Sequence, residues 1–371
     1  MIPGNGKYSN CRVCVFFVGG MTLESLRVGI VGSGFIAEHK HLPAWKNIGS
    51  TVRVAALCDV NAAHAQRLAG QFNVPQVHSD FNQMLKKERL DIVDICSPPR
   101  THAALALSAL QSGAHVLIEK PMAINTEECD VIITGAKNAQ RTVCVAHSDL
   151  FYPSFLRARQ MLADGHIGEF RGMHIFLSTP VDYITSRPQH WAHRLPGGVL
   201  GETGPHVIYL TLAFINQILD VRVSARKLLH EFTWSPYEDY RLELIGEKAT
   251  SSIALTYATH CWAAQVDLWG SEGLLKVDLE TQSVVLQRRP NLRRFTLGFS
   301  TASETAQMMR GTFGTAASYL SRRLENTHQR LVRGFVESIT DGKPIPVTAE
   351  EGREAVRVMD LILQKLNSST G

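Results

Sequence analysis

The sequence predicts an α/β chain in which an N-terminal domain with a doubly wound parallel sheet precedes an α+β domain with a large open, mainly antiparallel sheet. Its 371 residues exceed the roughly 100–200 residues of an ordinary single domain. Up to about residue 148, short apolar runs alternate with helix-like stretches, which is typical of parallel strands joined by crossover helices. Beyond that point the apolar runs follow one another closely and alternate with polar residues, which favours antiparallel strands.

The composition is that of an ordinary globular protein. Hydrophobic residues make up 44% of the chain and charged residues 19%, which argues against disorder. The net charge of +4 is spread along the chain, so no nucleic-acid partner is expected. The apolar stretch at 13–20 is far shorter than the roughly 20 residues of a membrane span, so no membrane partner is expected either.

The first 25 residues are set apart from the fold prediction. They are expected to be an N-terminal extension, either disordered or the product of an upstream start, because Met21 stands just before the first predicted strand. Cys11 and Cys14 form an isolated C-x-x-C without a second pair, so no metal site is predicted there. Other cysteines, such as Cys58 and Cys96, lie inside apolar runs, which suggests a reducing compartment and a cytoplasmic protein.

Five apolar runs mark the strands of the first domain, which we place at residues 26–148. They read LRVGIV, VRVAAL, DIVDIC, HVLIE and TVCVA. The segments between them carry alanine and leucine at helical spacing and end near glycines such as Gly70 and Gly113, as helices often do.

The second domain is placed at residues 149–371. A helix over 153–164 is expected to end at Gly165, and strands are expected at 169–178, 240–246, 250–258, 263–270 and 273–279. Residues 286–325 have weak periodicity and are predicted to form a surface excursion that is helical only towards 315–325. A last helix over 349–367 is predicted from Thr348 and Glu351, which have the spacing of a capping box.

The segment after the first strand has the pattern of a dinucleotide-binding turn. Gly32 permits a tight turn, Gly34 lets the backbone approach a pyrophosphate, and Ala37 is small enough for helix–strand contact. The phosphates would meet free N–H groups at the start of the next helix, so Ser33, Phe35 and Ile36 are also cofactor-binding candidates. Because the pattern follows a strand and opens a helix, it predicts a Rossmann domain.

Asp59 ends the second strand, about 25 residues after Gly34, near the position of the acidic residue that accepts the ribose hydroxyls. Its charge would repel a 2′-phosphate, and Val60 and Asn61 follow it rather than an arginine, so NAD is favoured over NADP as the cofactor. The alternative is that Asp59 only caps the helix that begins near Asn61.

Three motifs in order resemble the glucose-fructose oxidoreductase/inositol dehydrogenase/rhizopine catabolism (Gfo/Idh/MocA) oxidoreductase family. They are SPPRTHAALALSALQSGAHVLIEKP at 97–121, GHIGEFRG at 165–172 and GGVLGETGPHVIYL at 197–210. The resemblance covers about residues 26–285 and 330–365. It implies an NAD-dependent dehydrogenase that moves a hydride between nicotinamide and a hydroxyl or keto group of a sugar, cyclitol or related polyol.

The resemblance also implies catalytic roles. Lys120, in the motif Glu119-Lys120-Pro121, would touch both the nicotinamide ribose and the substrate and stabilise a developing alkoxide. His206 would take the hydroxyl proton. Where the family has aspartate four residues before this histidine, the chain has Glu202, which could orient His206 with shifted geometry. Pro205 is expected to begin a helix, which would leave Glu202 in the preceding turn.

Further site residues are expected from their positions at strand ends or from the resemblance. Those expected near the cofactor are Ser97, Pro98, His102, Glu119 and His147, and those expected near the substrate are Tyr152, Tyr183, His190, Trp191 and Arg194. An aromatic ring with polar neighbours suits a polyol, although Trp191 could equally belong to the core.

Three other functions compete with the dehydrogenase. Some relatives use bound NAD transiently to cleave a glycoside, so an NAD-dependent glycosidase or lyase is one alternative. A non-catalytic sugar sensor is another, although the retention of Lys120 and His206 argues against it. A metal hydrolase built on His190, His193, Glu202 and His206 has suitable ligand types, but their spacing matches no familiar zinc motif, so no metal is predicted.

The second-domain sheet also carries a prediction about assembly. Its open face would be a large apolar surface if left bare, and in the family this face commonly pairs subunits. A homodimer or homotetramer through that sheet is therefore expected.

Overall fold

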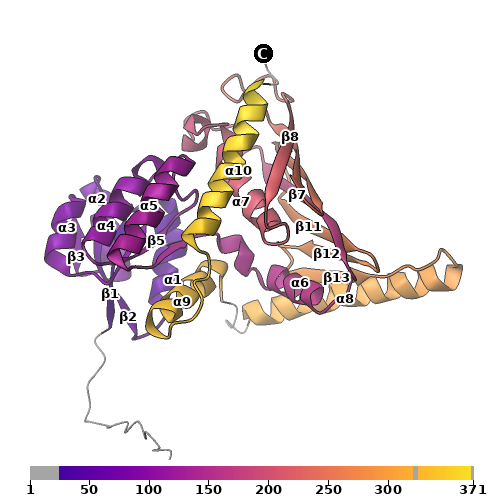
Figure 1. Ribbon diagram of the computed structural model, residues 1–371, viewed down its shortest axis with the longest axis horizontal. Helices are drawn as coiled ribbons and strands as arrows, with labels where there is room; N and C mark the ends of the chain where they lie inside the picture. The colour runs from indigo at the N-terminus through magenta and orange to yellow at the C-terminus, as the bar shows by residue number, and fades with distance from the viewer. Residues whose placement is uncertain (1–24, 321–324, 369–371) are drawn as a thin grey trace, which may run out of the picture.

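The computed structural model describes residues 25–320 and 325–368, so residues 1–24 of the expected N-terminal extension lie outside the described residues. Two sheets organise the chain, a six-stranded one followed by a seven-stranded one. Figure 1 shows them as separate bodies, with helix α10 (Ala349–Ser368) running between them. The predicted order of an α/β unit and an α+β unit is confirmed.

The first sheet is parallel throughout and has the strand order β3-β2-β1-β4-β5-β6. Every residue of β4 is buried, as expected for a central parallel strand covered on both faces. The edge strand β6 is also fully buried, and the Val145 N–H donates to the Val347 carbonyl just before α10. The bounds are β1 (Leu26–Val31), β2 (Val52–Cys58), β3 (Gln76–His78), β4 (Ile92–Ile95), β5 (His115–Ile118) and β6 (Val143–Val145). All five predicted strands are present, and the short β3 is an addition.

Helices cover both faces of this sheet (Figure 1). They are η1 (Ala37–His41), α1 (Leu42–Lys46), α2 (Ala62–Phe72), α3 (Phe81–Glu88), η2 (Pro99–Thr101), α4 (His102–Gln111) and α5 (Thr126–Ala139). The side chain of Asn61 caps α2 by accepting from the His64 N–H. That helix continues past Gly70 to the left-handed residue Asn73, so Gly70 does not end it, whereas Gly113 follows the end of α4 as predicted.

The second sheet is mixed and has the order β13-β12-β11-β7-β10-β9-β8, in which only β7 and β10 pair in parallel. Its bounds are β7 (Phe170–Pro180), β8 (Ile218–Arg226), β9 (Asp239–Gly246), β10 (Thr250–Thr259), β11 (Ala263–Gly270), β12 (Leu274–Asp278) and β13 (Ser283–Gln287). The two edge strands, β8 and β13, were not predicted, although apolar and polar residues alternate along most of β8.

Most helical segments of the second half lie around the inner face and lower edge of this sheet. They are η3 (Ser148–Phe151), α6 (Pro153–Ala163), η4 (Trp191–Arg194), α7 (Val199–Leu212) and α8 (Arg294–Leu320). Helix α9 (Thr327–Thr340) packs instead against the first domain. The inner face packs against α7 and α10 through residues such as Leu242, Leu255 and Ile362. None of the described helices is long and apolar enough to cross a membrane.

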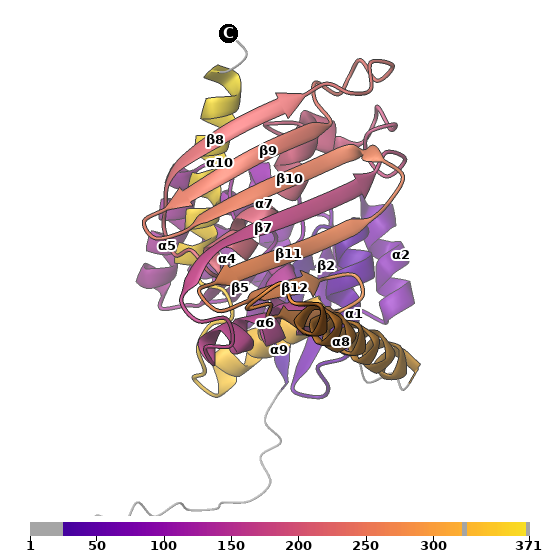
Figure 2. The ribbon, with the colours of Figure 1, turned by 90° about the vertical axis from the view of Figure 1, so that its right-hand side faces the viewer.

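The outer face of the second sheet is turned to the viewer in Figure 2, and no described helix lies over its middle strands. Arg222 and Glu243 pair across it, Arg241 is half exposed, and Gln265 and Lys276 are exposed. Apolar side chains share this face, since Phe176 pairs with Gln265 across it and Ile245 lies two residues after Glu243 on the same side of β9. The outer face is therefore mixed in character, and the expected large apolar surface is present only in part.

The C-terminal helices join the two hydrophobic cores. Leu331 and Phe335 of α9 pack into the first core, whereas Val358 and Ile362 of α10 belong to the second. The start of α10 has the predicted capping box, since Thr348 N–H donates to the Glu351 carboxylate at 2.7 Å and Glu351 N–H to the Thr348 hydroxyl at 3.1 Å.

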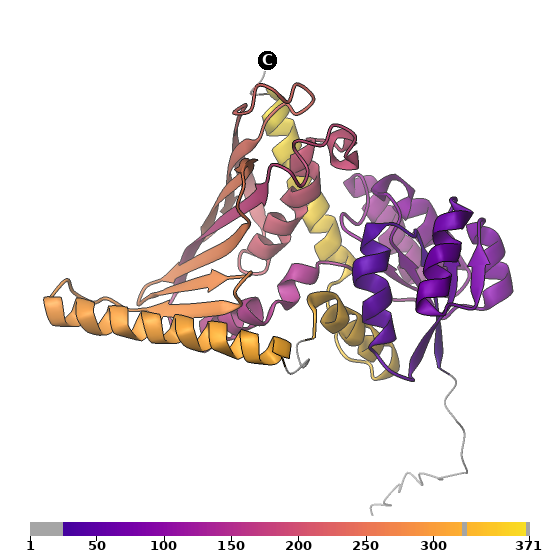
Figure 3. The same cartoon turned by 180° about the vertical axis from the view of Figure 1, so that it is seen from behind.

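Residues 294–320 form one α-helix of 27 residues, so the predicted excursion with a helix only at 315–325 is wrong. Gly298, Gly311 and Gly314 and many Ser and Thr residues lowered the apparent helical signal. Figures 1 and 3 show α8 lying along β13 and projecting well beyond the outer face of the second sheet.

Candidate active site

The turn after β1 has the backbone shape that its glycines predict. Gly32 has φ +97°, and a Cβ there would lie 2.6 Å from the backbone of Cys96 at the end of β4, so this position requires glycine. A Cβ on Gly34 would meet nothing within 4 Å, so open space lies over this part of the turn. The residues present therefore fit a cofactor pyrophosphate approaching the backbone here.

The flanking residues fit the same group. Ser33 is only 3% exposed, and within the described residues its buried hydroxyl oxygen has no hydrogen-bond partner. Phe35 is 62% exposed and stacks on His39, Ile36 is half-buried, and Ala37 is fully buried against the sheet. A bound ligand could give the Ser33 hydroxyl a hydrogen-bond partner and could cover the exposed ring of Phe35.

Asp59 follows β2 and reaches across the glycine turn. Its Oδ2 accepts from the Ser33 N–H at 2.6 Å, and its Oδ1 accepts from the Asn61 N–H at 2.8 Å. Because the Asn61 side chain caps α2, Asp59 is not the N-cap residue of the capping alternative. Its carboxylate lies beside the turn, where the adenosine ribose of a dinucleotide would lie.

Lys120 follows β5 and is linked to Pro121 by a cis peptide bond. Its ammonium donates to the Oε1 of Glu202 at 3.0 Å and to the backbone carbonyl of Glu202 at 3.1 Å. Burial alone would lower the pKa of Lys120, but the carboxylates of Glu202 and Glu119 outweigh it and raise the pKa. Lys120 is therefore held as an ammonium ion at the carboxyl edge of the first sheet.

Glu202 and His206 both lie on α7, which begins at Val199. The prediction that Pro205 starts this helix is wrong, since Pro205 lies inside it and the turn into the helix is made by Gly197 and Gly198, both with positive φ. Residues four apart on a helix share a face, so Glu202 and His206 point to the same side.

The carboxylate that contacts His206 belongs to Asp149 of η3. His206 Nδ1 lies 2.6 Å from the Oδ2 of Asp149 and 2.6 Å from the hydroxyl of Tyr209. Burial would raise the pKa of Asp149, but His206 outweighs it and lowers the pKa to about 2. Over residues 25–320 and 325–368, His206 Nε2 has no hydrogen-bond partner, so this nitrogen is available to a substrate.

Asp149 and Tyr209 were missed by sequence reasoning, although each carried a signal. Asp149 stands two residues after His147, in the polar run that ends β6, and such strand ends face the ligand crevice of a doubly wound sheet. Tyr209 lies three residues after His206 and so shares its helix face. Asp149 and Lys120 are close enough for the Asp149 charge to raise the pKa of Lys120, so the two pairs form one site.

The strand-end residues expected near the cofactor lie around this site, but several are enclosed. His102 is fully buried, and its ring nitrogens lie 3.0 Å from the Pro121 carbonyl and 2.8 Å from the Ser97 carbonyl. It therefore links the two loops that follow β4 and β5 and has no surface exposed to a cofactor. Ser97 is half-buried and Pro98 exposed. His147 stacks on Tyr209, and burial together with His206 lowers the pKa of His147 to about 3, so its ring is neutral.

The residues expected near the substrate are brought together only in part. His190 lies near Glu202; burial lowers the pKa of His190 and the Glu202 charge only partly offsets this. Trp191 stacks on His190 and is 48% exposed. Tyr183 instead contacts Trp262, in the turn between β10 and β11.

The other two substrate candidates differ in exposure. Tyr152 is half-buried beside Tyr209, whose pKa it helps to raise after the larger effects of burial and Asp149. Arg194 is exposed at the end of η4, and the described part of the chain gives it no ion-pair partner.

A fully buried charge network lies behind Lys120. His41 Nδ1 is 2.8 Å from Asp94 Oδ2, and His41 Nε2 is 2.8 Å from Glu119 Oε1. Burial would lower the pKa of His41, but Asp94 outweighs it and raises the pKa well above its ordinary value, so the ring is an imidazolium between two carboxylates. The other Glu119 oxygen accepts from the Lys120 N–H at 3.0 Å, which ties the network to the backbone of Lys120.

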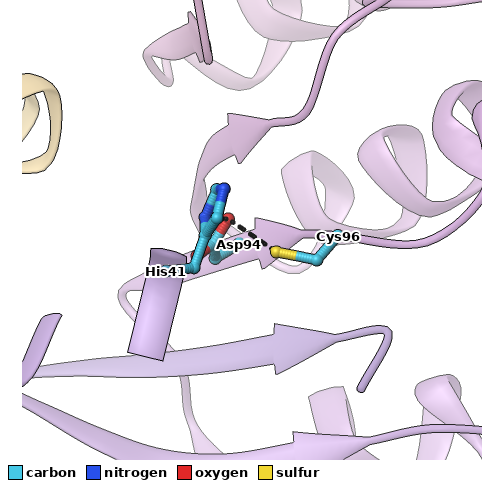
Figure 4. A group of neighbouring side chains, drawn as sticks. All are labelled: His41, Asp94 and Cys96. Atoms are coloured by element: carbon cyan, nitrogen blue, oxygen red, sulfur yellow. Dashed lines mark hydrogen bonds and ion pairs between the residues drawn. The ribbon is translucent and has the colours of Figure 1, made fainter. Parts of the chain in front are cut away.

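Figure 4 shows His41, Asp94 and Cys96 converging in this network. Within the described residues, side chains close enough to share a metal ion occur as two groups, His41 with Asp94 and Cys96, and His41 with Glu119 and His328. Neither group is the set His190, His193, Glu202 and His206 that a metal hydrolase would use. Because His41 is already hydrogen-bonded at both nitrogens, we interpret the buried groups as an ion network.

The family model described as "Oxidoreductase family, NAD-binding Rossmann fold" matches residues 26–147, and the model of the GFO/IDH/MocA C-terminal domain matches residues 155–307. The chain belongs to the GFO/IDH/MocA oxidoreductase family. Its first domain is thus an NAD-binding Rossmann domain, and the protein is a member of an oxidoreductase family.

Two relatives and one solved structure illustrate the similarity. A Comamonas testosteroni 1-carboxy-3-chloro-3,4-dihydroxycyclohexa-1,5-diene dehydrogenase is 29% identical over 53% of this chain, and the match spans only 49% of that relative. The Lactiplantibacillus plantarum inositol 2-dehydrogenase/D-chiro-inositol 3-dehydrogenase is 22% identical over 92% of this chain and 91% of its own length. The Bordetella pertussis WlbA dehydrogenase, solved with NADH and UDP-GlcNAcA, has a TM-score of 0.76 at 16% identity, covering 94% of this chain and 98% of that one.

Proposed function

We propose that this member of the family oxidises one hydroxyl of a sugar, cyclitol or related polyol, with Lys120, His206, Glu202 and Asp149 as its working residues. The observation that carries the proposal is the pairing of two functional groups with two separate carboxylates. The Lys120 ammonium is held by Glu202, and His206 is held through Nδ1 by Asp149, which leaves His206 Nε2 open.

The chemistry follows from these positions. Bound NAD supplies a nicotinamide ring that accepts the hydride from the reacting carbon. His206 Nε2 accepts the hydroxyl proton, Asp149 stabilises the resulting imidazolium, and the Lys120 ammonium stabilises the negative charge that develops on the oxygen before the carbonyl forms. One C–H and one O–H bond break, a C=O double bond forms, and the proton rests on His206.

The substrate class is supported by the relatives and by the residues near Glu202. Both curated relatives described above carry in their names a six-membered carbon ring with neighbouring hydroxyls. Trp191 offers an exposed aromatic face next to the polar His190, a pairing that suits the C–H face and hydroxyls of a polyol ring. We propose that Trp191 and His190 contact the substrate, with Tyr183 and Arg194 at the outer edge of the site.

The test is a screen of cyclitols, free sugars, cyclic dihydrodiols and aryl glycosides with NAD, following both NADH absorbance and product identity. The proposal expects stoichiometric NADH with a keto product. On the substrate found, Lys120→Ala should lower kcat by about 100-fold or more, because a charged electrostatic stabiliser is removed, while the Kd for NAD changes little. Lys276→Ala, at an exposed position on β12, is the matched control. Turnover unchanged in Lys120→Ala contradicts the assignment, and glycoside cleavage without net NADH supports the glycosidase alternative.

Assembly and location complete the proposal. A homodimer or homotetramer remains our prediction, with the mixed polar and apolar outer face of the second sheet as one candidate contact. Four buried free cysteines, Cys58, Cys96, Cys129 and Cys144, support a reducing compartment, which we take to be the cytoplasm.

A further inference from the structure

Helix α8 packs against its own chain with its polar side. The half-buried positions lie on one side of the helix, which is turned towards the second domain, and all but Leu297 and Gly311 are polar. They are Thr296, Leu297, Ser300, Glu304, Gln307, Gly311, Thr315 and Ser318. Two of them are hydrogen-bonded there: Gln307 exchanges bonds of 2.9 and 3.1 Å with the backbone of Leu286, and Glu304 accepts from Gln287 at 2.9 Å. The contact between α8 and the second domain is thus largely polar.

The opposite side of α8 is apolar and open to solvent. Phe295 is 83% exposed, Phe299 78%, Met309 51%, Phe313 66% and Leu320 87%. No residue of α8 whose side chain is described is buried. A surface helix normally buries its apolar stripe and exposes its polar face, and α8 does the reverse.

Three alanines, Ala302, Ala306 and Ala316, are exposed between these large residues. Together the eight residues, which we call the α8 stripe, follow one another from 295 to 320 in steps that alternate strictly between four and three residues. This spacing has the 3.5-residue average of a coiled-coil seam, sustained over more than three heptads. An exposed stripe with that period is built to receive another helix.

We propose that the α8 stripe pairs with the α8 stripe of a second copy of this chain, in antiparallel orientation, around a two-fold axis between residues 307 and 308. In that register Phe299 faces Ala316 of the partner copy, Ala302 faces the partner's Phe313, and Ala306 faces the partner's Met309. Large side chains therefore fill the space left by small ones at successive levels, as close packing requires.

The parallel register lacks this complementarity. It would stack Phe299 on Phe299 and Ala306 on Ala306, which crowds some levels and leaves voids at others. The antiparallel pairing is also isologous, so it closes as a dimer and leaves no stripe uncovered. Complementarity between two copies of one stripe favours a second copy of this chain over an unrelated partner.

The size and position of the stripe agree with such an interface. Each of its five large side chains contributes on the order of 100 Å² of accessible surface. Pairing two copies therefore buries about 1,000 Å², which is about the minimum area expected of a specific interface. Figures 1 and 3 show α8 at the edge of the second domain, with one end projecting beyond the sheet, so a partner helix can reach it. This pairing is separate from the sheet-face contact, and the two together would give a tetramer.

The first experiment measures the assembly mass of the full chain by sedimentation velocity over a concentration series. Phe299→Asp combined with Phe313→Asp should halve the assembly mass or raise the dimer Kd by about 100-fold or more, because two charges per copy enter an apolar seam. The matched control is Val60→Asp combined with Val131→Asp, two exposed apolar residues of the first domain, and it should keep the wild-type mass. Circular dichroism confirms that each variant remains folded. A monomeric wild type, or a double variant that keeps the wild-type mass, overturns the proposal.

The second experiment tests the orientation. Phe295→Cys and Leu320→Cys are made in separate proteins in which Cys11, Cys14 and Cys261 are serine, and the two are oxidised alone and after mixing. Because the two positions are about 38 Å apart along a helix, antiparallel pairing gives a disulfide-linked dimer only in the mixture. Cross-linking of either protein alone overturns the antiparallel register. Flotation of monomeric wild-type protein with phosphatidylserine/phosphatidylcholine vesicles would instead assign the stripe to a lipid surface and overturn the pairing.

Discussion

Replacing Asp149 by asparagine removes the charge that holds His206 and keeps the shape of the side chain. In the structure the Asp149 carboxylate lies 2.6 Å from His206 Nδ1, and both side chains are about one-fifth exposed. A carboxylate there selects the tautomer that carries its proton on Nδ1, so that Nε2 can accept a proton from the substrate. In the proposed reaction it would also stabilise the imidazolium that forms when His206 accepts the substrate proton. Asp149→Asn weakens both effects.

The loss can be estimated from the geometry. Two unit charges about 4 Å apart at an effective dielectric constant of about 20 interact by about 4 kcal/mol. A neutral amide would retain a hydrogen bond worth about 1 kcal/mol, so about 3 kcal/mol of transition-state stabilisation should disappear. That corresponds to a fall in kcat of about 150-fold. Binding of NAD should be unaffected, because Asp149 is on η3 and makes no contact with the glycine turn.

The assay is single-turnover formation of NADH on the substrate found by the screen, and the matched control is Asp164→Asn, at the exposed C-cap of α6. Nitrogen-15 NMR of the histidine side chains adds a test that needs no substrate, because wild-type His206 should be protonated on Nδ1. A kcat for Asp149→Asn within fivefold of wild type, or a wild-type His206 protonated on Nε2 alone, would refute the reasoning.

Three further substitutions test other parts of the site. Asp59→Ala should weaken NAD binding by about 10- to 100-fold, because it removes charge-assisted hydrogen bonds to the ribose. It should also reduce the preference for NAD over NADP. Isothermal titration calorimetry with both cofactors measures these affinities, and unchanged affinities would contradict the ribose role. His41→Leu leaves Asp94 and Glu119 without their cation and should cost about 3–5 kcal/mol of folding stability at pH 6. The pKa of His41 is raised in the folded protein, so the stability that the imidazolium contributes is fully present below the ordinary pKa of 6.5 and is lost as pH rises through the folded pKa. In calorimetry, the difference in Tm between wild type and variant should therefore shrink at alkaline pH. A constant difference in Tm would show that the network is not ionic. Glu202→Gln removes a charge that raises the pKa of Lys120, so the alkaline limb of the kcat/KM profile should move to lower pH and kcat at neutral pH should fall about tenfold; an unmoved limb would separate Glu202 from Lys120.

The first domain was predictable because its signals are local. Apolar runs of four to seven residues mark the buried parallel strands, and the glycine turn has a fixed place after the first of them. The second sheet was predicted only in its central strands, and the edge strands β8 and β13 were overlooked even though the residues of β8 alternate between apolar and polar. Helix α8 was missed for two reasons. Its glycines and its Ser and Thr residues have weak helical propensity. Its apolar stripe faces solvent, whereas the apolar stripe of an ordinary surface helix is buried against the core.

The sequence predicted individual residues of the candidate site, but it did not predict which side chains contact one another. Lys120 and His206 lie where the motifs place them, but the contact between His206 and Asp149 joins segments 57 residues apart, and no local spacing encodes it. The same holds for His41 and Glu119, which are 78 residues apart and meet only because β1, β4 and β5 are neighbours in the sheet. Long-range pairing of charges follows from sheet order, so it becomes visible only when the strands are placed.

This chain has Glu202 where the family has aspartate, and the contacts of two carboxylates explain why the change is tolerated: Glu202 contacts Lys120, and Asp149 contacts His206. Because α7 begins at Val199, Glu202 lies in its first turn, and both its side chain and its backbone carbonyl reach the Lys120 ammonium. An aspartate would withdraw the carboxylate by about one methylene and leave Lys120 with the carbonyl alone, whereas His206 would keep Asp149. The orientation of the histidine is therefore independent of the residue at position 202. A longer side chain there keeps a charge beside Lys120 while His206 keeps Asp149, so the departure from the family pattern agrees with the mechanism that we propose.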